Sequence, residues 1–523
     1  MLSPTGWAVL GLALLAACSD KQDHAAGSAQ PALTSRMSWA VPAGLSAPGA
    51  CAKALVGRHA TFDVGPGQKY PDLNGVPWLS LQAGDVVNVH WRPEPYRTKI
   101  GLRAQGSAAD PVVINGVTNE QCQRPEISGQ NAQIAADAIG EHYYSSGGVN
   151  ALGTVFINRG YDLVGNKARH IRLQNLKVTG ASSRYQFIAE DGQPTAYAKG
   201  AAGIYATVVE FLTIENCEVT DNDNGIFVNT RDEAEGLTSR HVTIRRNVVH
   251  LNGVPGSFTE HNLYVQASQA LYEGNYIGQL MQGAKGSSLK DRSSGTVIRY
   301  NHIVAAARAI DLVETDGGMK TVGKDPDYHR AWVIGNLIVS DMNNPGTSSV
   351  KLIHWGGDIN PEAFRNGILY AVNNTVILRG SSRQAPYFSV FDMPTAQQSV
   401  QAQDNIFWMD GSSKLFMGYE NGTVRLTGRN WISQGWEPGK RGEHVQVRTE
   451  GTVLEGESPG LDGDHEPTAD APVLDQGGSP FNTIPTPAHV LNIAVQHQYV
   501  PIAKTAARPL NGAAPDLGAF EGH

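Results

Sequence analysis

The sequence predicts an all-β protein whose chain winds as a single-stranded right-handed parallel β-helix, and three observations carry this prediction. Glycine accounts for 58 of the 523 residues without a Gly-x-y period, which indicates many tight turns. Short runs alternate apolar and polar residues with the period of two that is typical of β-strands. From residue 170 onward one phrase recurs, in which such a run is followed by an asparagine and then by more apolar residues.

The recurring phrase defines a repeat with one asparagine in each copy, namely Asn175, Asn216, Asn247, Asn275, Asn301, Asn336, Asn374, Asn405 and Asn430. Successive asparagines are 25 to 41 residues apart, so a minimum unit carries loops of variable length. An asparagine between two strands predicts a bend with left-handed backbone, and stacked asparagines can form a hydrogen-bonded ladder. A β-propeller is the alternative, but its blades of about 40 to 50 residues lack this phrase.

Two segments frame the repeat. Strand-like runs separated by glycines, from Val64 to Gly129, are typical of the first coils of a β-helix. Together with the repeat, they predict a β-helix over residues 51–435. A solenoid needs its open ends covered. The Pro- and Gly-rich residues 436–523 are therefore predicted to fold back on the last coils as a capping tail.

The composition excludes several classes of function. The chain has 41 Lys plus Arg against 49 Asp plus Glu, a formal charge of −8, which argues against a nucleic-acid partner. With 41% apolar and 17% charged residues it has enough apolar sequence for a large core. It lacks the motifs of nucleotide, haem, flavin and zinc sites, so no cofactor is expected.

The N-terminal residues predict export. Trp7–Ala17 is an apolar run too short to cross a bilayer, which takes about 20 residues, so residues 1–17 are predicted to be a signal peptide. The run ends in Leu-Ala-Ala-Cys, which resembles a bacterial lipobox. That resemblance implies a lipid on Cys18 and, with Ser19 next, a place in the outer membrane, on its periplasmic or surface face. Residues 18–50 have the composition of a flexible tether.

The remaining cysteines suggest one disulfide. In an exported protein Cys51 and Cys122 are predicted to pair and close a loop over the start of the fold. Cys217 lies inside an alternating apolar run and is expected to be buried.

Stacked coils place equivalent residues about 4.8 Å apart, so chemistry is expected in columns. Aligning GIFVNT, NLYVQA, SLKDRS and AIDLVET gives an outward column of Phe227, Tyr264, Lys290 and Asp311. The adjacent outward column is Asn229, Gln266, Arg292 and Val313. The strand ends add His261, Asn262, Glu314 and Asp316, and the next coil adds His354.

The segment LKDRSSGTVIRYNHI resembles the Lys-Ser phrase of the chondroitinase B and alginate lyase family, in which a lysine leads into an asparagine-ladder strand. The resemblance implies a pectate-lyase-like β-helix and a Brønsted-base role for Lys290. The family's acidic calcium ligands are absent, because Gly283 and Lys285 stand there, and its catalytic arginine falls near Val313 or Glu314. The chain is therefore expected to be divergent at its catalytic and metal positions, with no metal ligands assigned and a calcium ion left open.

Elimination from a uronate needs a group that neutralises the carboxylate, a base, and an acid for the leaving oxygen. Arg292 is the candidate to neutralise the carboxylate, as a guanidinium fork. Asp311 is expected to raise the pKa of Lys290, which makes Tyr264 or His261 the better base. The predicted catalytic residues are Lys290, Arg292, Tyr264, His261 and Asp311, and the predicted substrate-binding residues are Asn262, Gln266, Glu314 and His354.

Three functions stay open. The first is a lyase or related epimerase acting on an anionic polysaccharide. The second is an inverting glycoside hydrolase that uses Asp311, Glu314 and Asp316, with an acid and a base about 6.5 to 9.5 Å apart. The third is a non-catalytic glycan-binding lipoprotein, which the departures from the lyase pattern favour. Without a role in chemistry, Lys290 and Asp311 are expected to form an ion pair on a solvated face.

Overall fold

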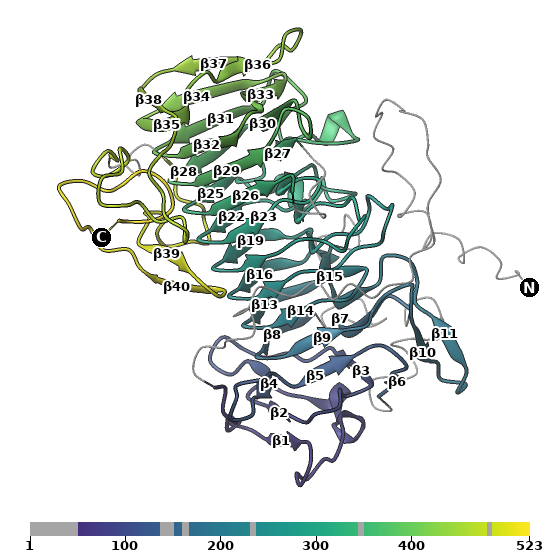
Figure 1. Cartoon of the computed structure of the whole chain (residues 1–523). Helices are drawn as coiled ribbons and strands as arrows, with labels where there is room; N and C mark the ends of the chain where they lie inside the picture. Colours follow the sequence, from purple (N-terminus) through teal and green to yellow (C-terminus); the bar gives the residue numbers. More distant parts are fainter. Residues whose placement is uncertain are drawn as a thin grey trace, which may run out of the picture.

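The computed structural model describes residues 51–135, 151–158, 167–230, 237–343, 350–478 and 484–522. Within this part of the chain, three sheets of 13, 14 and 11 strands run along one common axis (Figure 1). Strand pairing inside these sheets is parallel, except for β10 (Gln186–Ile188) with β11 (Pro194–Ala196). The prediction of a parallel β-helix is confirmed.

The first sheet consists of β1 (Thr61–Val64), β2 (Val86–His90), β4 (Val112–Val117), β8 (Ala168–Gln174), β13 (Val209–Glu215), β16 (Arg240–Arg245), β19 (Ser268–Glu273), β22 (Thr296–Arg299), β25 (Arg330–Ile334), β28 (Ile368–Val372), β31 (Ser399–Gln403), β34 (Thr423–Thr427) and β37 (Gln446–Thr449). The second sheet consists of β11, β10, β6 (Gln133–Ile134), β3 (Thr98–Leu102), β7 (Gly153–Asn158), β12 (Ala202–Thr207), β15 (Asn224–Asn229), β18 (Leu263–Val265), β21 (Leu289–Asp291), β24 (Ile310–Leu312), β27 (Lys351–Trp355), β30 (Tyr387–Met393), β33 (Lys414–Glu420) and β36 (Glu437–Gly439). The third sheet consists of β38 (Thr452–Gly456), β35 (Arg429–Ser433), β32 (Ile406–Gly411), β29 (Thr375–Gly380), β26 (Leu337–Asp341), β23 (His302–Val304), β20 (Tyr276–Ile277), β17 (Val248–Val249), β14 (Glu218–Val219), β9 (Lys177–Thr179) and β5 (Glu126–Ser128). The short 3-10 helices of the described residues are η2 (Leu73–Gly75), η3 (Trp78–Ser80), η6 (Val322–Lys324) and η7 (Pro361–Ala363).

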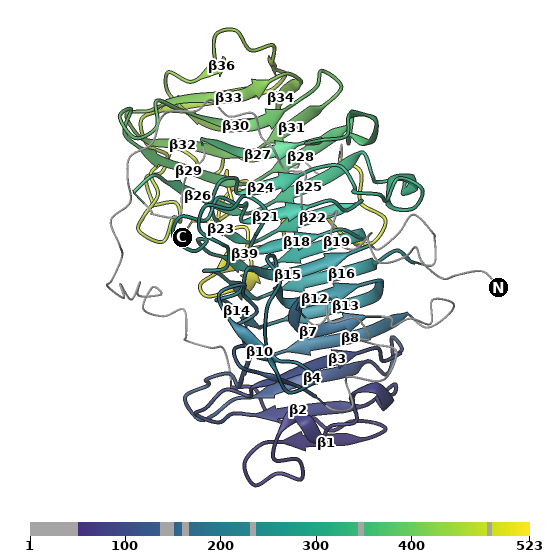
Figure 2. The ribbon, with the colours of Figure 1, turned by 90° about the vertical axis from the view of Figure 1, so that its right-hand side faces the viewer.

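Each regular coil takes one strand from the first sheet, then one from the third and one from the second, as β16, β17 and β18 do. Alternate side chains of these strands point inward, and Ile244, Val249 and Val265 are fully buried. One apolar core of such residues extends from the first coils to β35. Figure 2 shows the second sheet, from β12 to β33, stacked beside the first. The alternate side chains on the outer face of the second sheet are not part of this core, so they are available to form a functional site.

An asparagine ladder holds the corner between the first and third sheets. The side-chain Nδ2 of each member donates to Oδ1 of the next, at 2.9 to 3.1 Å, through Asn247, Asn275, Asn301, Asn336, Asn374, Asn405 and Asn430. These side chains are buried, so their amides depend on one another and on backbone groups for hydrogen bonds.

Two of the nine predicted asparagines are not equivalent to the rest. Asn175 and Asn216 lie one position earlier, where the backbone has a φ of 61° and 49°. Cys217 takes the ladder position in that coil, since its N–H donates to Oδ1 of Asn247 at 2.9 Å. The left-handed position precedes the ladder residue, and an asparagine suits either place, so the sequence phrase aligned the two positions as one.

The parallel stack extends past residue 435, where the sequence placed its end. The strands β36, β37 and β38 continue it to Gly456. The tail beyond then runs back along the side of the stack (Figure 1) and contains the antiparallel pair β39 (His497–Val500) and β40 (Lys504–Ala507). Its apolar residues cover outward side chains of the middle coils, such as Trp332 in the first sheet and Ile377 in the third. Ala471 and Val473 of the tail also pack with Trp431 of β35 and Leu454 of β38, so the tail covers the flank of the helix from its middle coils to its last.

Cys51 and Cys122 form a disulfide, and Cys217 is a buried free thiol. The predicted signal peptide, Cys18 and the tether of residues 18–50 lie outside the described residues. Among the residues that the structure describes, no helix is long and apolar enough to cross a membrane.

Candidate functional site

The outer face of the second sheet carries a column of chemically active side chains. Strand register places Phe227 beside Tyr264, Tyr264 beside Lys290, and Lys290 beside Asp311. The column continues through His354 to Asp392 on the next two coils. This order matches the alignment made from the sequence.

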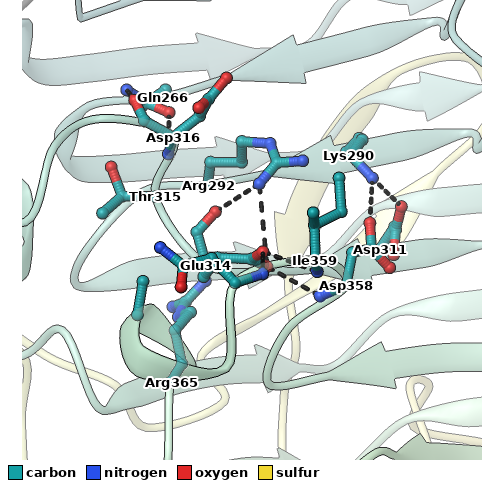
Figure 3. Close-up of polar contacts among 12 residues, drawn as sticks. Gln266, Lys290, Arg292, Asp311, Glu314, Thr315, Asp316, Asp358, Ile359 and Arg365 are labelled. Atoms are coloured by element: carbon teal, nitrogen blue, oxygen red, sulfur yellow. Dashed lines mark hydrogen bonds and ion pairs between the residues drawn. The ribbon is translucent and has the colours of Figure 1, made fainter. Parts of the chain in front are cut away.

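Lys290 lies at the centre of a buried ion-pair network. Its Nζ is 2.9 Å from Oδ2 of Asp311 and 2.6 Å from Oδ2 of Asp358 (Figure 3). Burial disfavours the ammonium, but the two carboxylates outweigh this effect and raise the pKa of Lys290. Lys290 therefore stays protonated at neutral pH and cannot act as the base. The expectation of a solvated Lys290–Asp311 pair is wrong, because the two side chains are 5% and 2% exposed.

Further groups hold Asp311 in its ionised form. Its Oδ1 accepts hydrogen bonds from Arg308 at 3.2 Å and from Nδ1 of His354 at 2.8 Å. Burial raises the pKa of Asp311, but Lys290 and Arg308 oppose it and bring the pKa well below its usual value. For Asp358, burial and Asp311 raise the pKa, whereas Lys290 and His354 bring it below the ordinary value. Both carboxylates are thus charged.

Glu314 fixes the loop that brings Asp358 over the sheet. Its carboxylate accepts the backbone N–H groups of Asp358, Ile359 and Asn360, each at 2.8 Å. Arg292 joins this arrangement, since its Nη1 donates to the backbone oxygen of Glu314 at 2.6 Å and lies 3.8 Å from the carboxylate (Figure 3). Glu314 is therefore a positioning residue instead of a ligand contact.

Arg292 still has unused hydrogen-bonding capacity. Its Nε is buried without a hydrogen-bond partner among the described residues. Burial opposes its charge, but Tyr264 and Glu314 raise its pKa, so the guanidinium is permanently protonated. Tyr264 is half-buried and stacks on Phe227 with ring centroids 4.8 Å apart. Arg292 and Lys290 lie on the same side of the sheet (Figure 3), and the C-terminal tail packs elsewhere.

His261 is a buried neutral imidazole. Its Nδ1 accepts the backbone N–H of Ser287 at 2.8 Å, so the proton of the neutral ring is on Nε2. Burial, with Lys290 adding to it, lowers the pKa of His261 to about 3. A ring whose free nitrogen already accepts a hydrogen bond cannot remove a proton from a substrate, so the predicted base role is wrong. The Nε2–H group can donate.

Two predicted substrate-binding residues are used within the fold. Asn262 is fully buried, accepts a hydrogen bond from Asn252 at 2.9 Å and donates to the backbone of Gly278 at 2.7 Å. Gln266 exchanges two hydrogen bonds with the backbone of Asp316, at 2.9 and 2.8 Å. Both side chains therefore hold loops in place, and neither amide is free for a ligand.

One donor set resembles a metal site. Asp311, His354 and Asp358 each place one ligand atom within 4.8 Å of the others, and a divalent cation takes such donors. Lys290 and Arg308 already neutralise these carboxylates, so an added cation has to compete with two buried cationic side chains. We derive no chemical step through a metal.

Sequence reasoning missed Asp358 and Arg308. Asp358 follows β27 in a loop, and Arg308 precedes β24, so neither occupies a position in the strand alignment. Arg308 contacts Asp311, Asp358 and Asp392 at 3.2 to 3.5 Å. Both are charged residues a few positions outside strands that carry the column, which is the one sequence signal that could have indicated them.

No family model matches the chain, and no curated protein is similar to it. Among solved structures, it is similar to the pectate lyase Pel9A, with 10% identity, a TM-score of 0.37 and coverage of 88% of this chain and 96% of that one. It is also similar to an alginate lyase from Paenibacillus sp. str. FPU-7, with 13% identity, a TM-score of 0.33 and coverage of 72% of this chain and 93% of that one. A GH136 lacto-N-biosidase from Eubacterium ramulus has 9% identity and a TM-score of 0.29, with coverage of 76% of this chain and 68% of that one. The assignment of the fold rests on the strand pairing described above.

Proposed function

We propose that this chain is a polysaccharide lyase that cleaves an anionic, uronate-containing polysaccharide by β-elimination on the outer face of the second sheet. The observation that carries the proposal is Arg292, a buried and permanently charged guanidinium whose Nε has no partner within the described chain. Such a group suits a carboxylate, which accepts hydrogen bonds from two guanidinium nitrogens at once. An epimerase that removes the same proton without breaking the chain uses the same site.

The proposed reaction starts when Arg292 neutralises the uronate carboxylate, which acidifies the hydrogen on the adjacent carbon. A base removes that proton, the electron pair of the broken carbon–hydrogen bond forms a carbon–carbon double bond, and the bond to the glycosidic oxygen breaks as this oxygen takes up a proton. Tyr264 is the proposed proton carrier, because its phenol is half-buried and interacts electrostatically with Arg292. The phenol oxygen takes the proton while it is a phenolate, whose charge the neighbouring Arg292 offsets, and the phenol so formed returns that proton to the leaving glycosidic oxygen.

A hydrolase is less well supported by the same contacts. Glycoside hydrolysis needs one carboxylic acid that is protonated before the reaction. Asp311 and Asp358 both have lowered pKa values because Lys290 lies between them, and Glu314 accepts three backbone N–H groups. Asp311 and Glu314, two of the three carboxylates expected for a hydrolase, are therefore not placed as proton donors, and the third, Asp316, is exposed in the loop after β24.

The test is the formation of unsaturated product, followed by ultraviolet absorbance, from pectate, alginate, chondroitin and heparan sulfate. For a substrate that is cleaved, Arg292→Ala is expected to reduce kcat roughly 10²- to 10³-fold through lost carboxylate stabilisation. Tyr264→Phe is expected to reduce it roughly 10²- to 10⁴-fold. Arg299→Ala, which removes an arginine from the first sheet, is the matched control and should retain activity.

New reducing ends without unsaturated product would contradict elimination and favour hydrolysis. Equal activity of the Tyr264→Phe variant and the unaltered protein would remove Tyr264 from the reaction. We also propose, from the lipobox-like sequence alone, that a lipid on Cys18 holds the protein in the outer membrane of a bacterial envelope.

A further inference from the structure

A surface depression lies at the edge of the second sheet, where the chain enters β18. It has a volume of about 420 Å³ and is lined by Lys199 and by the loop of residues 254–259. Sites for small ligands are typically clefts of roughly 300 to 1,000 Å³, so one sugar unit or a disaccharide fits this space.

The loops around the depression lead directly to the site described above. Pro255 forms a bridge with Ala284, and the N–H of Lys285 donates to the backbone oxygen of Ser257 at 2.8 Å. A few residues further on, the same two segments meet again where the N–H of Ser287 donates to Nδ1 of His261. The depression and the column of Tyr264 and Lys290 are thus connected by two short stretches of backbone, both ending in strands of the second sheet.

The side chains at the depression suit a carboxylate-bearing sugar. Phe258 is 44% exposed, and Nζ of Lys285 lies 4.8 Å from the centre of its ring. Lys199 and Lys285 are both exposed, and neither has an acidic partner within 4.0 Å among the described residues. By contrast, Lys290 and Arg308 in the neighbouring site are already neutralised by aspartates.

Glu260 adds an acceptor behind this surface. It is fully buried, and its Oε1 accepts a hydrogen bond from Oγ1 of Thr259 at 2.7 Å, whereas Oε2 has no partner within the described residues. Thr259 lines the depression, so its hydroxyl connects the surface to this carboxylate. The hydroxyl of Thr259, and not the buried carboxylate behind it, is the polar group that a sugar in the depression can reach.

We propose that this depression is a subsite for a uronate unit of the polysaccharide, next to the unit that is cleaved. The ring of Phe258 packs against the apolar face of the sugar, and Lys199 and Lys285 attract its carboxylate. The proposal rests on the proposed function for its choice of polymer, but it concerns binding and not chemistry.

Calorimetric titration with hexamers of galacturonate, mannuronate and guluronate tests the subsite, with cellohexaose as the neutral probe. Phe258→Ala is expected to weaken binding of the preferred anionic hexamer roughly three- to tenfold. The double variant Lys199→Ala/Lys285→Ala is expected to weaken it by a similar factor that shrinks as salt is raised. The double variant should bind cellohexaose as weakly as the unaltered protein does.

Two matched controls separate the subsite from general surface effects. Phe211→Ala removes a phenylalanine that is 42% exposed on the first sheet, and Lys69→Ala removes an exposed lysine that lies over Tyr70 at 5.2 Å. Both controls should bind the hexamers like the unaltered protein.

The possible outcomes distinguish the subsite from the lyase proposal. If the Phe258 and lysine variants lose affinity while no polysaccharide yields unsaturated product, the subsite holds and the proposed reaction fails. If unsaturated product forms but these variants bind hexamers normally, the reaction holds and the subsite is overturned. Failure of every anionic hexamer to bind the unaltered protein also overturns the subsite.

Discussion

Replacing Lys290 by methionine removes the cation that two buried carboxylates share. Lys290 is 5% exposed, and its loss leaves Asp311 and Asp358 with Arg308 at 3.2 and 3.4 Å as their remaining strong counter-charge. Removing one partner of a buried pair costs about 3 to 5 kcal/mol. Because Arg308 and His354 stay in place, we expect a loss of unfolding free energy of about 3 kcal/mol, at the lower end of that range.

Lys351→Met is the matched control. Lys351 also contacts two carboxylates, those of Asp392 and Glu420, but at 3.5 Å in both cases and with 24% of its side chain exposed. Contacts of this kind contribute about 0 to 1 kcal/mol. Chemical unfolding followed by circular dichroism, with the same denaturant series for both variants, should therefore show a much larger shift of the midpoint for Lys290→Met.

The pH dependence of this difference has a definite sign. The folded pKa values of Asp311 and Asp358 are lowered, so their contribution to stability is present above their ordinary pKa and is lost as the pH falls through the folded values. Without Lys290 these pKa values rise, and protonation relieves the uncompensated charge. The cost of Lys290→Met should shrink between pH 7 and roughly pH 4, near the ordinary pKa of an aspartate. An equal cost at both pH values, or a cost no larger than that of Lys351→Met, would refute the buried network.

Three further predictions follow from other parts of the chain. Asn336→Ala, in the middle of the ladder, should lower the unfolding free energy by about 1 to 3 kcal/mol because it leaves buried partners unsatisfied, whereas Asn131→Gly, at an exposed left-handed position, should be nearly neutral in the same unfolding experiment. Because burial lowers the pKa of His261 to about 3, its ring should stay neutral from pH 8 to pH 5, and a nitrogen chemical shift that titrates near pH 6.5 would contradict this. Cys18→Ala should release the protein from membranes into the soluble fraction after cell fractionation, and unchanged retention would exclude a lipid anchor at this residue.

The repeat made the fold and the main column predictable. A strand that pairs in register with the strand one coil away must place equivalent residues side by side, so aligning the phrases was enough to put Tyr264, Lys290 and Asp311 in one row. The alternation of apolar residues also decided which of them face outward. The nine asparagines were found for the same reason, although their phrase did not distinguish the left-handed position from the ladder position after it.

The tertiary structure alone decided how this column is covered and which side chains stay available. Asp358 and Arg308 come from connecting segments, whose lengths vary from coil to coil and follow no period. The three N–H groups that bind Glu314 meet at its carboxylate only once the loop after β27 is folded. These segments turn an outward pair into a buried ion network and use up the side chains of Asn262 and Gln266. Strand periodicity is a local property that a sequence carries in its pattern, whereas burial and charge pairing depend on residues that meet from distant loops.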